Sequence, residues 1–221
     1  MNGVKFDTKH SYDDLDLILS SKTIGSPSVK ITTVDIPGAD GVLDFTEFFG
    51  EPKYNNRTLT FEFRSIKAFS AQLAQDSNVK NALHGKKMKI VLDDDPNYYF
   101  YGRVSVGDWE SENNIGKVTI TCDCDPYKRK QTVTTATFTA STTEQTGTIT
   151  NSGRMTVVPT VEVSASTEGE EVSVTLQFDE GSISLGAGTY TLDNFALKQG
   201  THTIKYSGTG TIKFTFREGE L

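Results

Sequence analysis

Residues 88–106 read MKIVLDDDPNYYFYGRVSV, and this stretch decides how the first half of the chain folds. Apolar and polar side chains alternate on both sides of an acidic break, which is the two-residue period of half-buried β-strands. At the break, Asp95 and Pro96 are residues that favour a turn. The stretch therefore predicts a β-hairpin, with one strand over Met88–Leu92 and the other over Tyr98–Val106.

The aromatic run after the turn divides between the two faces of its strand. Phe100 falls in the phase of the buried side chains, whereas Tyr99 and Tyr101 share the opposite face with Arg103. An exposed row of tyrosines is typical of a surface that packs against another domain or subunit, because the ring is apolar while the hydroxyl group stays solvated. We therefore expect Tyr99, Tyr101 and Arg103 to form a candidate interface.

The acidic run raises two chemical hypotheses. Asp93, Asp95 and Asn97 match the first three ligand positions of a helix-flanked calcium loop. That loop requires Gly at its sixth position and a bidentate Glu at its twelfth, where this chain has Tyr98 and Val104. A pair of catalytic carboxylates requires one buried and one solvated member, whereas adjacent aspartates at a turn are all solvated. We expect only the corner of a hairpin, with an adventitious calcium site as the alternative.

Strands with the same alternation surround the hairpin. TLTFEFR (residues 58–64) and KVTITCDC (residues 117–124) each present one apolar and one polar face. The second stretch places Cys122 and Cys124, the two cysteines of the chain, on its core face. A strained local disulfide and half of a metal site are alternatives, but we expect two buried thiols in a reducing compartment.

The segment over residues 65–84 departs from the strand pattern and predicts a helix. Ser65 is a candidate N-cap, and Gly85 suits a left-handed residue after the helix. The apolar spacing slips at residues 76–78, so we expect a kinked helix or two short ones that cover the first sheet. The apolar residues of the expected buried face are Ile66, Phe69, Leu73, Val79, Ala82 and Leu83.

Composition shifts near residues 127–134 and indicates a domain boundary there. Residues 132–221 hold 21 of the 30 threonines and alternate strand and turn patterns throughout, with an expected turn at residues 207–210. We therefore expect a first domain over residues 1–131, a β-sandwich or barrel-like domain with one helical segment. A second domain over residues 132–221 is expected to be a β-sandwich, so the fold class is mainly β.

Charge and histidine spacing exclude further classes of function. With a net charge of −7, the chain lacks a general attraction to DNA phosphates or anionic membranes. No apolar stretch has the length of a signal peptide or a spanning helix, so we expect synthesis in a cytosol. His10, His84 and His202 have no metal-ligand spacing, and nucleophile, phosphate-loop and dinucleotide-binding motifs are absent from the sequence. The sequence therefore predicts neither an enzyme nor a metal or cofactor.

Several stretches, in order along the chain, carry a resemblance to a known family. The most recognisable is VDIPGADGVLDFTEFFGEPKYNNRTLTFEF (residues 34–63), in which Gly38 and Gly41 permit a tight turn with positive φ. The others are VKFDTKHSYDDLDLIL, LHGKKMKIVLDDDPNYYFYGRV, ITCDCDPYK, ITNSGRMTVVPTVEV and FREGEL. Together they resemble the distal tail proteins of bacteriophages with long, non-contractile tails (siphoviruses) and of related prophages.

The resemblance implies a virion structural protein at the tip of a phage tail, assembled in the cytoplasm of the host bacterium. The first domain would close into a hexameric ring, with the second projecting outwards as a galectin-like sandwich. Such a ring is a baseplate hub that joins the tail tube protein to the tail-tip and receptor-binding proteins. DNA would pass through its channel without sequence-specific binding, and no membrane insertion is implied.

Other functions remain as alternatives to this hub. Residues 135–221 could form a carbohydrate-binding module for host cell-wall glycans, and a hydrolase acting on wall polymers is a further hypothesis. The aromatic residues of this half, however, lie in the apolar phase of their strands, which indicates a core rather than a sugar-stacking surface. They are Phe178, Tyr206, Phe214 and Phe216. Within the structural class, a tail-tube subunit is the competing hypothesis.

Overall fold

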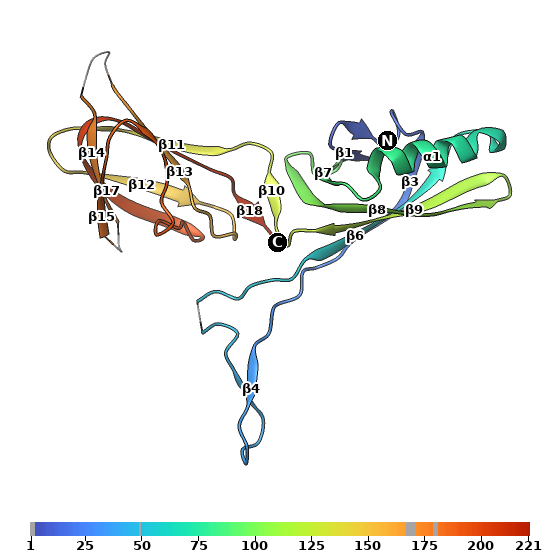
Figure 1. Ribbon diagram of the computed structural model, residues 1–221, viewed down its shortest axis with the longest axis horizontal. Helices are drawn as coiled ribbons and strands as arrows, with labels where there is room; N and C mark the ends of the chain where they lie inside the picture. Colours follow the sequence, from blue (N-terminus) through green and yellow to red (C-terminus); the bar gives the residue numbers. More distant parts are fainter. Residues whose placement is uncertain (1–2, 49, 167–170, 179–180) are drawn as a thin grey trace. The chain divides into compact units, whose positions relative to one another are not determined.

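The computed structural model describes residues 3–48, 50–166, 171–178 and 181–221 (Figure 1). The chain forms two compact units, which we call unit 1 (Met1–Lys128 with Leu221) and unit 2 (Arg129–Glu220). Both consist mainly of strands, so the expected mainly β class is confirmed. No helix among the described residues is long and apolar enough to cross a membrane.

Unit 1 is built on an antiparallel sheet whose strands follow the order β2-β1-β7-β8-β9-β6-β3. Its core forms where the alternating apolar side chains meet on one face: Phe61 and Phe63 are buried, and the ring of Phe6 packs edge-on against Phe61 with centroids 6.2 Å apart. The strands are β1 (Val4–Phe6), β2 (Lys9–His10), β3 (Leu17–Ile24), β6 (Arg57–Ser65), β7 (Lys87–Leu92), β8 (Tyr98–Glu112) and β9 (Ile115–Cys124).

Strands β7 and β8 form the predicted hairpin. The Asp95 N–H donates to the Leu92 carbonyl at 3.0 Å and closes the turn. Phe100, Val104 and Val106 are buried, as their phase in the sequence predicts. The β7–β8 hairpin therefore lies at the centre of the sheet, with β7 paired to β1 and β8 paired to β9.

The two cysteines are free thiols on the core face of β9, and both are fully buried. This confirms the expected buried thiols and excludes a local disulfide. Burial, with a smaller effect from neighbouring carboxylates, raises the pKa of Cys124 to about 12, and burial also raises the pKa of Cys122. Both thiols stay protonated at neutral pH and act as small apolar side chains.

The helical segment is shorter and more regular than predicted. A 3-10 turn, η1 (Phe69–Ala71), leads into α1 (Gln72–Leu83), which runs through residues 76–78 without interruption. The predicted break there is wrong. Lys80 Nζ lies 2.9 Å from Asp76 Oδ2, and an ion pair four residues apart stabilises the helix across this point.

The two ends of the helical segment differ in how well they were predicted. Ser65 does not cap the helix, because it is the last residue of β6 and its hydroxyl donates a hydrogen bond to Gln75 Oε1. Gly85 follows the helix with φ +77°, in the left-handed region expected for it. Strand β6 therefore takes in Ser65, the first residue that the sequence pattern assigned to the helix.

Between β3 and β6 the chain leaves the sheet as a long hairpin over residues 26–56, which we call the arm (Figure 1, labelled β4). Its strands, β4 (Thr33–Asp35) and β5 (Val42–Asp44), pair only with each other. Gly38 and Gly41 lie at its tip with φ of 83° and 80°. None of the described residues of the arm is buried.

Unit 2 is organised around one long strand, β17, which pairs with β11, β12, β13 and β14. Its first part pairs with β12 and β14 and its second part with β11 and β13, so that a single strand takes part in both halves of the unit. The strands of this sheet are β11 (Thr134–Ala140), β12 (Gln145–Asn151), β13 (Thr160–Ser164), β14 (Ser173–Phe178), β15 (Gly181–Leu185), β16 (Gly188–Thr191) and β17 (Gly200–Phe216). Two short strands, β10 (Lys128–Lys130) and β18 (Gly219–Glu220), pair with each other outside it.

The turn predicted at residues 207–210 is wrong, because β17 continues through it. Gly208 and Gly210 have φ of 120° and 124°, and a Cβ atom on Gly208 would lie 1.9 Å from the Ser173 carbonyl oxygen. The two glycines therefore bend the strand where it changes partners, a common use of glycine in sheets that share a strand.

Candidate interaction surfaces

The acidic corner of the β7–β8 hairpin connects three other segments of unit 1. The pairs are Asp93 with the N–H of Gly3, Asp94 with Lys22 of β3, and Asp95 with Lys128. The hydrogen bond from Lys22 holds the pKa of Asp94 below its usual range, so this carboxylate is ionised at neutral pH and is no general acid. In the part of the chain that the structure describes, no group of three or more His, Cys, Asp or Glu could hold a metal ion.

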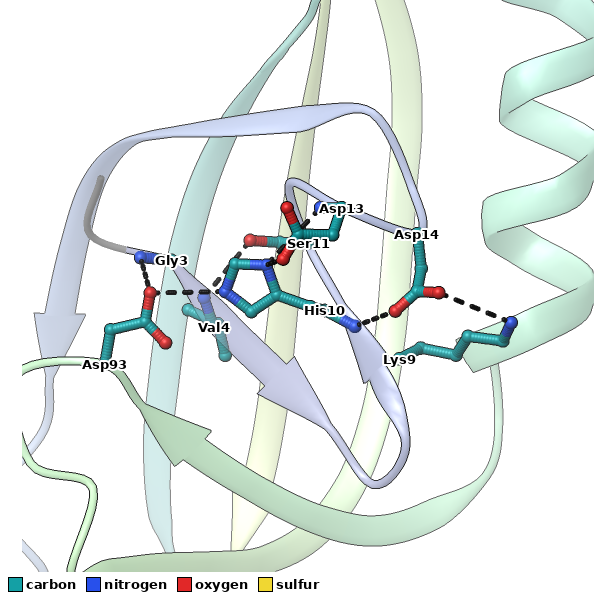
Figure 2. Close-up of polar contacts among 8 residues, drawn as sticks. All are labelled: Gly3, Val4, Lys9, His10, Ser11, Asp13, Asp14 and Asp93. Atoms are coloured by element: carbon teal, nitrogen blue, oxygen red, sulfur yellow. Dashed lines mark hydrogen bonds and ion pairs between the residues drawn. The ribbon is translucent and has the colours of Figure 1, made fainter.

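Asp93 is also part of a polar cluster around His10, shown in Figure 2. His10 Nδ1 lies 3.0 Å from Asp13 Oδ2, and Nε2 lies 3.2 Å from Asp93 Oδ2. The His10 N–H donates to Asp14 Oδ2 at 2.7 Å. The cluster ties the β1–β2 hairpin to the β7–β8 turn. No local signal marks this contact, because 83 residues separate His10 from Asp93.

Ser11 gives this cluster the residue types of a hydrolase triad but not its geometry. Ser11 is fully buried, and its hydroxyl oxygen accepts a hydrogen bond from the Val4 N–H at 3.1 Å (Figure 2). A nucleophile must be reachable and must bond to its base. The other histidines have separate partners: His84 Nδ1 accepts from the Val106 N–H, and His202 Nε2 lies 2.8 Å from the Lys198 carbonyl. The cluster is therefore structural.

The tyrosine face of β8 is more covered than its sequence predicts. Tyr99 is only 6 % exposed, which corrects the expected exposed row; Tyr101 is half-buried and Arg103 is exposed. Lysines of β7 cover the rings, with Lys89 Nζ 5.0 Å from the Tyr99 centroid and Lys87 Nζ 4.9 Å from that of Tyr101. The alternation alone could not show this, because the covering side chains come from the neighbouring strand.

The arm carries an exposed apolar surface that the sequence pattern did not single out. Its large apolar side chains are between 46 % and 72 % exposed at Ile31, Val34, Ile36, Val42 and Leu43, and Phe48 is 69 % exposed. Isolated exposed apolar residues are common, but a run of them on one hairpin is typical of a contact surface. The arm also holds five acidic residues and two lysines, a net charge of −3.

A second exposed apolar surface lies at the start of the helical segment. Ile66, Phe69 and Leu73, which we call the helix surface, are 45 %, 61 % and 78 % exposed. The expectation that they face the sheet is wrong. Gln72 and Gln75 point inward instead and are buried.

Hydrogen bonds to backbone carbonyls explain why the glutamines face inward. Gln75 Nε2 donates to the Leu15 and Asp16 carbonyls at 2.8 and 3.0 Å, and Gln72 Nε2 donates to the Asn114 carbonyl at 2.8 Å. A buried amide with full partners is tolerated in a core. The glutamines thereby fix the rotation of the helix and hold its apolar side in solvent.

A polar hollow of about 470 Å³ lies on the solvent side of the unit 1 sheet. Exposed charges of both signs line it, among them Glu62, Arg64 and Glu110. A small-molecule site is usually largely apolar with a few convergent polar groups, which this hollow lacks. The surfaces that stand out are therefore suited to macromolecular contacts.

No family model matches the chain, and no curated protein does. A solved structure matches over its whole length: the SPP1 Dit (gp 19.1) protein, described as a paradigm of the hub adsorption apparatus in phages that infect Gram-positive bacteria. The alignment covers 98 % of this chain and 99 % of that one, with a TM-score of 0.73 and 18 % sequence identity. The chain has the fold of SPP1 Dit. The resemblance to distal tail proteins noted in the sequence is thus confirmed at the level of the fold, in both units.

Proposed function

We propose that this chain is a structural component of a phage tail, the hub at the distal end of the tail. Six copies would close into a ring through unit 1 and join the tail tube protein to the tail-tip and receptor-binding proteins. The observation that carries the proposal is the likeness to SPP1 Dit over nearly the whole of both chains. A likeness confined to one unit would fit many β-sandwich proteins of unrelated function.

Exposed apolar surfaces support an assembling role. A ring requires two different surfaces on each copy, because head-to-tail contacts close only when one patch meets another. Unit 1 has candidates for both in the arm and the helix surface. The face of Tyr101 and Arg103, next to the buried Tyr99, is a further proposed contact to a subunit or domain.

The charge of the chain is compatible with a channel for DNA. A net charge of −7 disfavours a lumen that holds phosphates, and passage through a hub requires that DNA is not retained. The role needs neither catalysis nor a cofactor. It would place the protein in the virion after assembly in the cytoplasm of the host.

The carbohydrate hypothesis for unit 2 gains no support from the structure. Tyr206, Phe214 and Phe216 are buried, and Phe178 packs against the same core. This confirms the core placement expected from their strand phase and leaves them unable to stack on a sugar.

Electron microscopy and mass photometry of the purified full-length chain test the proposal. Rings are expected, either with the chain alone or after co-expression with the tube or tip protein of the same phage. Growth into long tubes would favour a tail-tube subunit, and a chain that stays monomeric with each of these partners would contradict the hub.

A further inference from the structure

Arg57 is a buried cation at the root of the arm, where strand β6 begins. The residue is only 7 % exposed. Its Nε donates to the Gly25 carbonyl at 2.8 Å, and its Nη1 donates to the Pro126 carbonyl at 3.3 Å. Gly25 follows β3, where the arm leaves the sheet, and Pro126 follows β9. One side chain therefore joins both strands at the root of the arm to the segment after β9.

The outgoing strand of the arm lies close against β6 at this point. The Gly25 N–H donates to the Thr58 carbonyl at 2.9 Å, and a Cβ atom on Gly25 would lie 2.6 Å from the same oxygen. Because a real Cβ atom does not come so close to an oxygen, only glycine lets the two backbones meet in this way. The Gly25 carbonyl is thereby held within reach of the Arg57 guanidinium.

Two further contacts connect the returning strand of the arm to the same part of unit 1. The ring of Tyr54 packs edge-on against that of Tyr127, with centroids 5.9 Å apart. Asn56 Nδ2 donates to Asp123 Oδ2 at 3.2 Å. Together with Arg57, these contacts hold the root of the arm against the end of β9 and the residues that follow it.

The partners of Arg57 explain what its charge contributes. Both hydrogen-bond acceptors are neutral carbonyls, and burial lowers the pKa of Arg57. The Phe100 ring, 5.2 Å from Cζ, offsets part of the cost of removing the charge from water. An apolar side chain of similar length would be buried there at a lower cost. It could not join two carbonyls from separate segments, which the planar fork of an arginine does with little loss of freedom.

Beyond its root, the arm depends on its own two strands. Strands β4 and β5 pair only with each other, and none of the described residues of the arm is buried. A hairpin without buried side chains is free to move as far as its root allows. The contacts at the root therefore determine whether the arm has a fixed direction.

We propose that Arg57 is the positioning residue of the arm. Its guanidinium fixes both strands at the root to the end of β9, so that the arm presents its exposed apolar side chains in one direction. This positioning is a property of the single chain, whereas its use in ring closure rests on the proposed hub function. An arm that is already fixed loses less freedom when it docks, which strengthens assembly without adding a contact.

Distances between two nitroxide labels on the full-length chain test the positioning. One label is attached at Leu43→Cys in the arm and the other at Ser105→Cys, an exposed position of β8. The native Cys122 and Cys124 are fully buried and stay unlabelled. Measured at a concentration where the chain is single, the distribution of distances should be narrow when Arg57 is present.

Two variants at the root should widen this distribution. Arg57→Met removes the fork and should widen it by about twofold or more. Gly25→Ala keeps Arg57 but displaces the Gly25 carbonyl from β6, and should widen it as well. Arg64→Met, at an exposed position of the same strand, is the matched control and should leave the distances unchanged.

Two other measurements separate positioning from a role in the core and connect it to assembly. Trp109 fluorescence should show nearly the wild-type unfolding transition for Arg57→Met, because an apolar residue in place of a buried charge is often neutral or stabilising. A role in the core alone would lower the stability and leave the distances as they are. Arg57→Met should also raise the concentration at which half of the chain is assembled by about threefold or more, and Arg64→Met should not.

The outcomes distinguish the positioning from the hub. Distances as narrow in Arg57→Met and Gly25→Ala as in the wild type would overturn the positioning, as would a wild-type distribution as wide as that of the variants. Widened distances with unchanged assembly of Arg57→Met would overturn its use in ring closure. A wild-type chain that never associates, even with the tube or tip protein, would overturn the hub alone, since the distances are measured on the single chain.

Discussion

Strand β6 and the arm that precedes it in the chain are both rich in apolar residues, but only β6 buries them. Phe61 in β6 has no exposed surface, whereas Ile31 in the arm is 72 % exposed. The strand has neighbours on both sides and a helix and β1 over its apolar face, while the two strands of the arm have only each other. An apolar side chain in β6 thus stabilises the fold, whereas an apolar side chain in the arm is available for assembly.

The largest effect on folding should come from emptying the β6 core. Phe61→Ala should lower the free energy of unfolding of unit 1 by about 3–5 kcal/mol, through lost burial and a cavity. Ile31→Ala in the arm should change it by no more than about 0.5 kcal/mol. Urea unfolding followed by Trp109 fluorescence measures both, since this residue, the sole tryptophan of the chain, packs against the unit 1 core. Equal losses would refute the contrast between the two regions.

A smaller loss is expected where the helix meets the sheet. Gln75→Met keeps the length of the side chain but leaves the Leu15 and Asp16 carbonyls without its amide donor. The unfolding free energy of unit 1 should fall by about 1–3 kcal/mol. Leu73→Met, on the exposed side of the same helix, is the control and should be close to neutral. A neutral Gln75→Met would show that the glutamine does not set the rotation of the helix.

The tyrosine face should affect assembly more than stability. Tyr101→Ala should weaken subunit or domain contacts by about 1 kcal/mol or more, and adding Tyr99→Ala should also destabilise unit 1 because this ring is buried. Replacing Asp93, Asp94 and Asp95 by Asn should leave assembly intact. Size-exclusion profiles of the tyrosine variants and of the asparagine variant compare their assembly. Loss of assembly in the asparagine variant alone would instead identify the acidic corner as the interface.

The smallest effect concerns the ion pair between Asp94 and Lys22, because the Asp94 side chain is 46 % exposed. The pKa of Asp94 is lowered in the fold by the Lys22 hydrogen bond, so its contribution is present above the unfolded pKa and is lost as pH falls through the folded one. Asp94→Asn should cost at most about 1 kcal/mol at pH 7 and progressively less below about pH 4. Thermal unfolding measured between pH 7 and below about pH 4 checks this pH dependence, with Asp40→Asn in the arm as the neutral control.

Much of the fold could be predicted from the sequence, because the two-residue alternation is a local signal. It correctly predicted that Phe61, Phe100 and Cys122 lie in the core and that β7 and β8 form a hairpin. The same alternation could not show that Tyr99 is covered by Lys89, because the covering residue belongs to another strand. Nor could it show that β17 continues through Gly208, where a bent strand and a turn use the same residues.

The candidate surfaces were less predictable than the fold. Helical spacing assigned Ile66, Phe69 and Leu73 to the buried side. The structure exposes them because Gln72 and Gln75 turn inward and donate hydrogen bonds to the backbone carbonyls of Asn114 and Leu15. Those carbonyls belong to segments distant in the sequence, so local periodicity contains no trace of them. The apolar pattern alone does not distinguish a residue that belongs to the core from one that is available for contact with a neighbouring copy.

The most direct test of a ring-forming hub is the mass and shape of the full-length chain in solution. Mass photometry should show a species of six times the 24.2 kDa chain mass, and negative-stain images should show rings, alone or with the tube or tip protein. Exposed arm residues should contribute to this assembly, so Leu43→Ser should shift the population from the ring to the single chain. A uniform 24.2 kDa species for the wild type, with and without those partners, would contradict the account.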